Sequence, residues 1–173
     1  MNIDQILLNA TKRIKQNYFQ LPIDGQEDPI YRERVYCYEL YHQLRISWPD
    51  ETKYELSGEV DKSGHPLIRG NNLDNVKPDL LVHIPGDMRG NYLVIEVKPL
   101  IANKEGIKKD LKTLTAFRRY AGYRKAIYLF YGQGDIQYKI NQIMGLAKDE
   151  AEIDLSQIEL WWHSEVGSSA EKI

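Results

Sequence analysis

Two apolar segments, each interrupted by an acidic residue, limit most strongly how this chain can fold. They cover 77–84 and 92–98, with the sequences KPDLLVHI and YLVIEVK. Branched and aromatic residues favour β-strands. A carboxylate in such a strand is costly to bury unless a positive charge meets it. Asp79, Glu96 and Lys98 therefore indicate a charged cluster on two buried strands.

The strand periodicity predicts which of these side chains share a face of the sheet. Side chains alternate along a strand, so Glu96 and Lys98 lie on the face of Val94, and Asp79 lies on the face of Leu81. If a hairpin joins the two segments, its register can place Asp79 beside Glu96. Paired carboxylates suit Mg²⁺ or Mn²⁺. A nearby lysine can contact a phosphate or the attacking water, so the pattern predicts a phosphoryl-transfer site.

Pro78-Asp79 followed by Glu96-Val97-Lys98 resembles the signature of the PD-(D/E)xK nuclease superfamily. The resemblance implies a restriction-endonuclease-like αβββαβ core of class α/β over about 29–131, with a mixed sheet flanked by helices. It also implies a Mg²⁺-dependent (or Mn²⁺-dependent) nuclease that hydrolyses phosphodiester bonds, most readily in DNA. Asp79, Glu96 and the backbone carbonyl of Val97 would hold the metal. Lys98 would orient the attacking water or help to deprotonate it.

The residue pattern predicts an element order that agrees with this resemblance. Apolar residues at helical spacing predict an opening amphipathic helix, and Asp28-Pro29 is a good helix start, with an N-cap followed by proline. We expect helices over 2–18, 29–45, 103–120 and 135–148, and strands over 54–60, 77–84, 92–98, 126–131 and 158–163. A turn is expected at 61–64. A strand–helix–strand unit after Lys98 predicts a parallel crossover within a mixed sheet.

The superfamily often adds a glutamate from its first helix to the metal site, and this chain offers two. On a helical wheel Glu33 falls within the stripe of Cys37, Leu40 and Leu44, whereas Glu39 lies off it. The alternatives are a first-turn acid favoured by the helix dipole for Glu33 and a surface acid for Glu39. We therefore keep Glu33 and Glu39 as two candidates for the catalytic site. A third possibility is that neither glutamate belongs to it.

Charge is unevenly distributed along a chain whose net charge is only −2. From Lys98 to Lys125 there are nine basic residues and two acidic ones, whereas from Asp135 onward three basic residues face eight acidic ones. A basic band beside an acidic metal site suits a nucleic-acid backbone, although a solvated helix face explains it equally well. The candidate nucleic-acid-binding residues are Lys104, Lys108, Lys109, Lys112, Arg118 and Arg119.

Length and composition set the remaining expectations. The 173 residues, 42% of them hydrophobic, suit a single domain with a real core, carrying an N-terminal helix at 1–20 and a C-terminal helix and strand at 135–163. One cysteine, no signal-peptide pattern and no membrane span predict a cytoplasmic protein. By analogy with enzymes that cut both DNA strands, a homodimer is possible.

Two other functions fit the same residues. The first is an inactive nuclease-fold module that binds nucleic acid or a protein partner, although such a module has no use for a costly carboxylate pair. The second is a metal-assisted hydrolase of small phosphoesters, which should lack the steep salt dependence of polymer binding. The sequence leaves open DNA or RNA, substrate structure, endo- or exonucleolytic action and the biological pathway.

Overall fold

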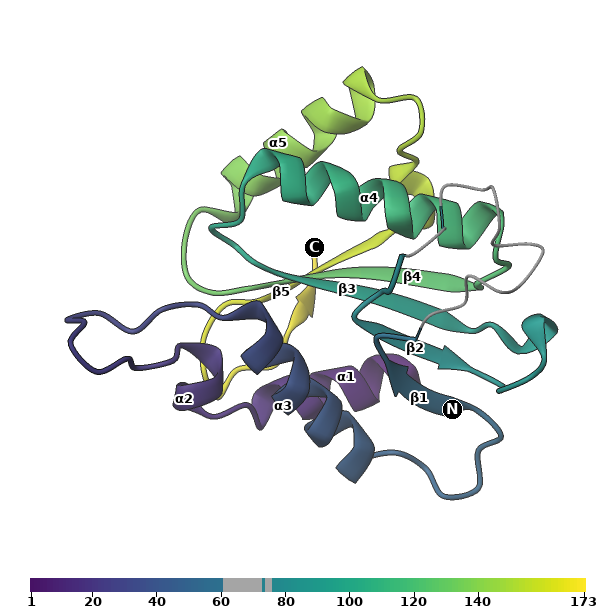
Figure 1. Ribbon diagram of the computed structural model, residues 1–173, viewed down its shortest axis with the longest axis horizontal. Helices are drawn as coiled ribbons and strands as arrows, with labels where there is room; N and C mark the ends of the chain where they lie inside the picture. Colours follow the sequence, from purple (N-terminus) through teal and green to yellow (C-terminus); the bar gives the residue numbers. More distant parts are fainter. Residues whose placement is uncertain (61–72, 74–75) are drawn as a thin grey trace.

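A mixed β-sheet forms the middle layer of the fold, which we describe from a computed structural model for residues 1–60, 73 and 76–173 (Figure 1). Its strands follow one another across the sheet in chain order. They are β1 (Glu55–Gly58), β2 (Leu80–His83), β3 (Leu93–Pro99), β4 (Lys125–Tyr131), β5 (Glu159–His163) and β6 (Glu171–Lys172). The β3–β4 and β4–β5 pairs are parallel, and the other pairs are antiparallel.

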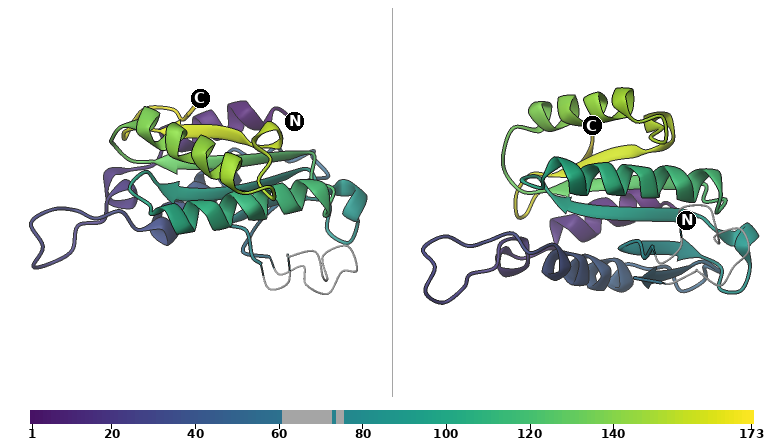
Figure 2. Two further views of the ribbon diagram at one scale, coloured as in Figure 1. Left: turned by 90° about the horizontal axis from the view of Figure 1, so that it is seen from above. Right: turned by 45° about the horizontal axis from the view of Figure 1, so that its top comes forward.

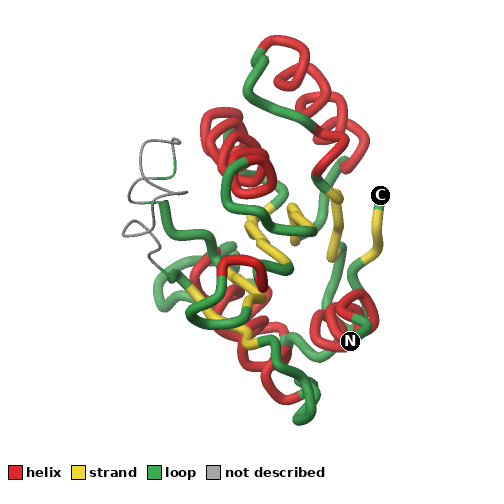
Figure 3. Tube along the Cα trace, turned by 90° about the vertical axis from the view of Figure 1, so that its right-hand side faces the viewer, coloured by secondary structure: helices red, strands yellow, loops and turns green. Residues whose placement is uncertain are grey.

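Helices cover both faces of the sheet, which gives a three-layer α/β arrangement (Figures 2 and 3). One outer layer contains α1 (Ile3–Lys12), α2 (Gln16–Phe19) and α3 (Glu33–Ile46), and the other contains α4 (Lys104–Arg119) and α5 (Ile136–Asp149). Two short 3₁₀ turns, η1 (Met88–Gly90) and η2 (Leu155–Gln157), lie in the connections. The expected class, a mixed sheet flanked by helices, is confirmed.

Strand alternation divides the interior into two cores. Leu93, Ile95 and Val97 of β3 pack toward α1 and α3, whereas Val94 packs toward α4. The same alternation on β4 places Ile127 and Leu129 in the first core, and Tyr128 and Phe130 in the second. All of these side chains are buried. The predicted parity of the β3 segment, which decides where Glu96 and Lys98 point, is therefore confirmed.

Two of the expected helices differ from the prediction. The opening helix is not continuous over 2–18: the chain breaks between α1 and α2, and Ile14 in the break and Phe19 at the end of α2 are both buried in the first core. The expected start of α3 at Asp28-Pro29 is wrong, because Ile30 pairs with Leu21 in an isolated antiparallel bridge. That pairing holds the backbone extended, so the helix begins only at Glu33.

The strands agree more closely with the prediction: β1, β2 and β5 are shorter than expected, β3 is shifted by one residue, and β4 begins one residue earlier. β2 begins at Leu80, so Asp79 lies just before it, after Pro78, which has no backbone N–H for a ladder bond. β6 was not expected; it adds two residues beside β5. The turn expected at 61–64 lies outside the described residues. Among the described residues, no helix is long and apolar enough to cross a membrane.

Candidate active site

Asp79 and Glu96 lie opposite each other where β2 and β3 separate. Leu80 pairs with Ile95, so one further step of the antiparallel register places Asp79 across from Glu96. The Asp79 carboxylate accepts a hydrogen bond of 2.8 Å from the backbone N–H of Val97. Glu96 is buried, with 6% of its surface exposed. The two carboxylates therefore meet as the strand parity predicts.

Lys98 places its ammonium group between acids from both helical layers. Its Nζ lies 2.8 Å from Glu33 Oε2 on α3 and 3.4 Å from Asp110 Oδ2 on α4. The hydroxyl of Tyr128 on β4 donates to the same Asp110 oxygen at 2.9 Å. Because Glu96 and Tyr128 are register partners on β3 and β4, the polar cluster occupies one face of adjacent strands. Together with Asp79 and Glu96, Glu33 and Asp110 thus make four acids around Lys98.

The burial of these acids shapes their protonation. Burial, with repulsion from Glu33, raises the pKa of Asp79 to about 6, although its bond from the Val97 N–H opposes the shift. Burial and the nearby charges of Asp79 and Asp110 raise the pKa of Glu96 well above its usual range. Burial and these neighbouring charges therefore favour the protonated form of Glu96, whereas a nearby positive charge favours the ionised form.

The charge of Lys98 is reinforced by the same neighbours. Burial disfavours the ammonium ion, but the carboxylates of Asp110 and Glu33 outweigh it and raise the pKa of Lys98. Burial raises the pKa of Asp110, against the opposing effect of Lys98. A lysine held in this way is a charged hydrogen-bond donor and a poor proton acceptor, so deprotonation of water by Lys98 is disfavoured.

The donor set suits a hard divalent cation. Asp79 and Glu96 supply carboxylate oxygens, which Mg²⁺ and Mn²⁺ prefer. Burial raises the pKa of both acids, with repulsion from Glu33 added for Asp79 and repulsion from Asp79 and Asp110 added for Glu96, and a bound cation would offset these effects. In the part of the chain that the structure describes, no group of three histidine, cysteine, aspartate or glutamate side chains is arranged to hold a metal. The predicted set has two such side chains and the Val97 carbonyl, and magnesium sites often complete such sets with water.

The structure separates the two candidate glutamates of α3. Glu33 contacts Lys98 and so belongs to the cluster. Glu39 instead accepts a hydrogen bond of 2.7 Å from Gln43, one turn later on the same helix. The alternative that Glu39 is a surface acid is wrong, because only 8% of Glu39 is exposed. α3 is covered over a wider arc than its apolar stripe of Cys37, Leu40 and Leu44 indicates.

Most of the candidate nucleic-acid-binding residues on or near α4 have partners within the chain. Lys108 and Lys112 form ion pairs with Glu150, and Lys112 also pairs with Glu152. Arg118 donates to the backbone carbonyl of Tyr123. Lys104 and Lys109 are exposed, and within the described residues neither forms an ion pair.

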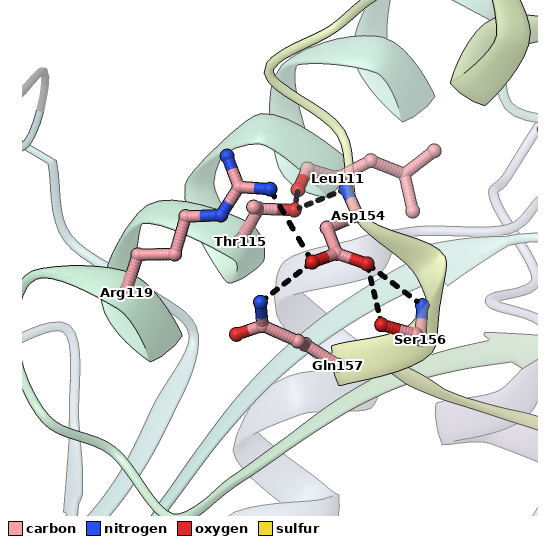
Figure 4. A network of polar contacts seen from close by, with 6 residues as sticks. All are labelled: Leu111, Thr115, Arg119, Asp154, Ser156 and Gln157. Carbon is pink, nitrogen blue, oxygen red and sulfur yellow. Dashed lines mark hydrogen bonds and ion pairs between the residues drawn. The ribbon is translucent and has the colours of Figure 1, made fainter.

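Arg119 belongs to a structural network around Asp154 (Figure 4). Asp154 accepts bonds from Arg119 at 3.3 Å, from Gln157 at 2.6 Å and from the hydroxyl of Ser156 at 2.6 Å. Its backbone N–H donates to Thr115 Oγ1 on α4 at 3.1 Å. These bonds lower the pKa of Asp154 to about 2. Arg119 thus helps to fix the segment before β5 against α4.

Tyr128 is a site residue that sequence reasoning missed, and for Asp110 the sequence does not decide whether it lines the site. Tyr128 lies within an apolar strand, where an aromatic residue looks like core packing. The available signal was parity: Tyr128 shares its face with Phe130, as Glu96 shares its face with Lys98. The helical position of Asp110 beside buried Leu111 also hinted that it points inward.

In comparisons with known proteins, no family model, no curated protein and no solved structure matches the chain. The functional conclusion therefore depends on the geometry of the site.

Proposed function

We propose that this chain is a metal-dependent nuclease with a restriction-endonuclease-like core, acting on phosphodiester bonds in nucleic acid, most readily in DNA. One observation carries the proposal: Asp79, Glu96 and Lys98 meet on one face of neighbouring strands, and Glu33 reaches the same lysine. The order α3, β1, β2, β3, α4, β4 supports it further, because the superfamily that the motif resembles has this order in its core.

Asp79 and Glu96 would hold Mg²⁺ or Mn²⁺, with the Val97 carbonyl as a third oxygen. When bound, the metal would acidify a water molecule and neutralise charge on the phosphate. The N–H of Val97 orients the Asp79 carboxylate by its bond to Oδ2. Glu96 would bind the cation as a carboxylate, so a bound cation would oppose the rise of its pKa.

Lys98 would act as a fixed positive charge. Glu33 and Asp110 hold its ammonium group, and Tyr128 holds Asp110 in turn. A preorganised charge of this kind stabilises the negative charge that develops on the phosphate in the transition state. Its amine protons can also orient the attacking water. Lys104 and Lys109 are the basic residues best placed to contact the nucleic-acid backbone, because they have no ion pair within the described residues.

The test is incubation of the purified protein with single-stranded and duplex DNA and RNA in Mg²⁺ or Mn²⁺. We expect cleavage that disappears with EDTA, with Asp79→Ala and with Lys98→Met. Lys148→Met is the matched control, because Lys148 is exposed at the end of α5. Cleavage that persists in both site variants would refute the assignment.

The alternatives give distinct results in the same experiment. Metal-independent binding without cleavage of any substrate would indicate an inactive binding module. Hydrolysis of a small phosphodiester that is insensitive to salt, without cleavage of polymers, would indicate a small-phosphoester hydrolase.

A further inference from the structure

A cavity of about 370 Å³ lies between α3 and the end of β1, directly beside the candidate metal site. Asp79 forms part of its wall, so the cavity and the charged cluster share a residue. Tyr38 and Tyr41 project from α3 on one side, and Gly58 and Glu59 border it on the other. Any group that occupies this cavity lies next to whatever Asp79 binds.

The walls of the cavity are largely aromatic and apolar. Tyr38 is 61% exposed, and Tyr41 is half-buried. Leu80 and Cys37 complete the apolar part of the lining. Burial raises the pKa of the Cys37 thiol, so this group stays uncharged. Such a surface favours a flat, partly apolar ligand that can stack on a tyrosine ring.

The charged groups at the cavity argue against a phosphate as its occupant. Among the described residues that line it, the acids are Asp79 and Glu59, and none is a lysine or arginine. The nearby Arg34 pairs with Glu59 at 3.6 Å. The two carboxylates would therefore repel a phosphate, whereas they would not repel an uncharged nucleobase. The carboxylate of Glu59 can in addition accept hydrogen bonds from the amino groups of a base.

The backbone has an uncommon conformation where β1 ends beside this cavity. Glu59 has a φ of +48°, the only positive φ of a non-glycine residue within the described part of the chain. Such a conformation is costly and often marks a functional site. Its N–H donates to the carbonyl of Asp79 at 3.2 Å, which ends β1 beside the acid. Gly58 lacks a side chain where a Cβ would lie 3.5 Å from the Asp79 carbonyl and 4.0 Å from the Tyr41 ring.

We propose that this cavity binds the base of the nucleotide next to the scissile phosphate. The inference rests on the proposed nuclease function, and it specifies the substrate class: a strand that is unpaired at that nucleotide. A paired base stays stacked in the duplex and cannot enter a cavity on the protein surface. Single strands, frayed ends and flaps are therefore the expected substrates, and an intact duplex is a poor one.

The test is equilibrium binding by fluorescence anisotropy. A short labelled DNA single strand is compared with the same strand in a blunt duplex, in Ca²⁺, with the strand verified as intact afterwards. Tyr38→Ala removes the exposed ring, and Gly58→Val fills the cavity with a residue that suits a strand. Tyr138→Ala is the matched control, because this tyrosine is 65% exposed on α5 in the opposite helical layer.

We expect the single strand to bind more tightly than the duplex, and Tyr38→Ala to weaken single-strand binding at least about fivefold. Gly58→Val should weaken it similarly, while Tyr138→Ala should not. Circular dichroism of each variant verifies that it is folded. Equal affinity for both forms of DNA, or equal effects of Tyr38→Ala and Tyr138→Ala, would overturn the proposal.

The two proposals fail in different ways. If no substrate is cleaved but binding depends on Tyr38 and Gly58, base binding in the cavity is supported and the proposed hydrolytic function is refuted. If DNA is cleaved with the expected dependence on Asp79 and Lys98, but the cavity variants cleave duplex and single strand as the unmodified protein does, the cavity proposal falls alone.

Discussion

Replacing Asp79 by asparagine should make the metal-free protein more stable at neutral pH. The pKa of Asp79 is about 6 in the fold, against an ordinary 3.8, mainly because burial disfavours its charge. Each pKa unit corresponds to about 1.4 kcal/mol. The ionised carboxylate therefore costs the folded protein up to about 3 kcal/mol at pH 7. Asparagine keeps an oxygen that can accept the Val97 N–H, so the substitution removes the charge and retains that bond.

The protonation of Asp79 in the folded and unfolded states determines how pH changes the free energy of unfolding. Between about pH 4 and pH 6 the folded protein holds a proton on Asp79 that the unfolded chain has lost. The free energy of unfolding of the unmodified protein should therefore fall as pH rises through this window. Below it, Asp79 is protonated in both states and contributes nothing. The advantage of Asp79→Asn should thus appear above about pH 4 and be complete above about pH 6.

Urea unfolding followed by tryptophan fluorescence measures the difference, in EDTA at several pH values. Asp24→Asn is the control, because Asp24 is exposed on the segment between α2 and α3. Adding Mg²⁺ should then stabilise the unmodified protein in proportion to the logarithm of its concentration, and Asp79→Asn much less. The reasoning is refuted if Asp79→Asn is less stable than the unmodified protein at pH 7 in EDTA, or if both show the same slope with pH.

Three further substitutions probe other parts of the structure. Asp110→Asn removes a carboxylate that holds Lys98, so cleavage should slow about tenfold or more with DNA affinity unchanged; an unchanged cleavage rate would argue against that role. Glu150→Gln removes the ion-pair partner of Lys108 and one of the two partners of Lys112, so DNA binding measured by anisotropy should tighten and its salt dependence steepen; no change would mean that Lys108 does not contact the DNA backbone. Leu111→Ala empties a buried position under α4 and should cost about 2–5 kcal/mol in urea unfolding, whereas a much smaller loss would mean that the core closes over the gap.

The sequence predicted the charged cluster on β2 and β3 because strand periodicity is a local property. A period of two fixes that Glu96 and Lys98 share a face, and a hairpin brings Asp79 opposite Glu96. Both features follow from residues close together in the chain. The parallel pairing of β3 with β4 was predictable for a related reason, since a helix connects the two strands.

The start of α3 and the choice between Glu33 and Glu39 were not predictable, because both depend on distant contacts. Asp28-Pro29 is a good local start for a helix, but the pairing of Ile30 with Leu21 overrides it. Glu33 joins the site through Lys98, which is far from it in sequence. A helical wheel contains neither of these contacts.

The basic residues of α4 show that charge along the sequence, like helix position, cannot be interpreted without distant contacts. Counting residues between Lys98 and Lys125 gives a strongly positive segment, but the acids that neutralise much of it come from 150–154. A local count cannot reveal partners that the fold brings from elsewhere. The same acids made the C-terminal part look negative in isolation.

The two edge strands of the sheet are short: β1 has four residues and β6 has two. Unpaired backbone groups on a long, flat edge strand can pair with a strand of another chain, and short edge strands reduce that risk. β6 also covers β5, which carries Trp161 and Trp162, and the N–H of neighbouring Ala170 donates to Thr11 on α1. With only two residues, β6 therefore protects the outer edge of β5 from pairing with another copy of the chain.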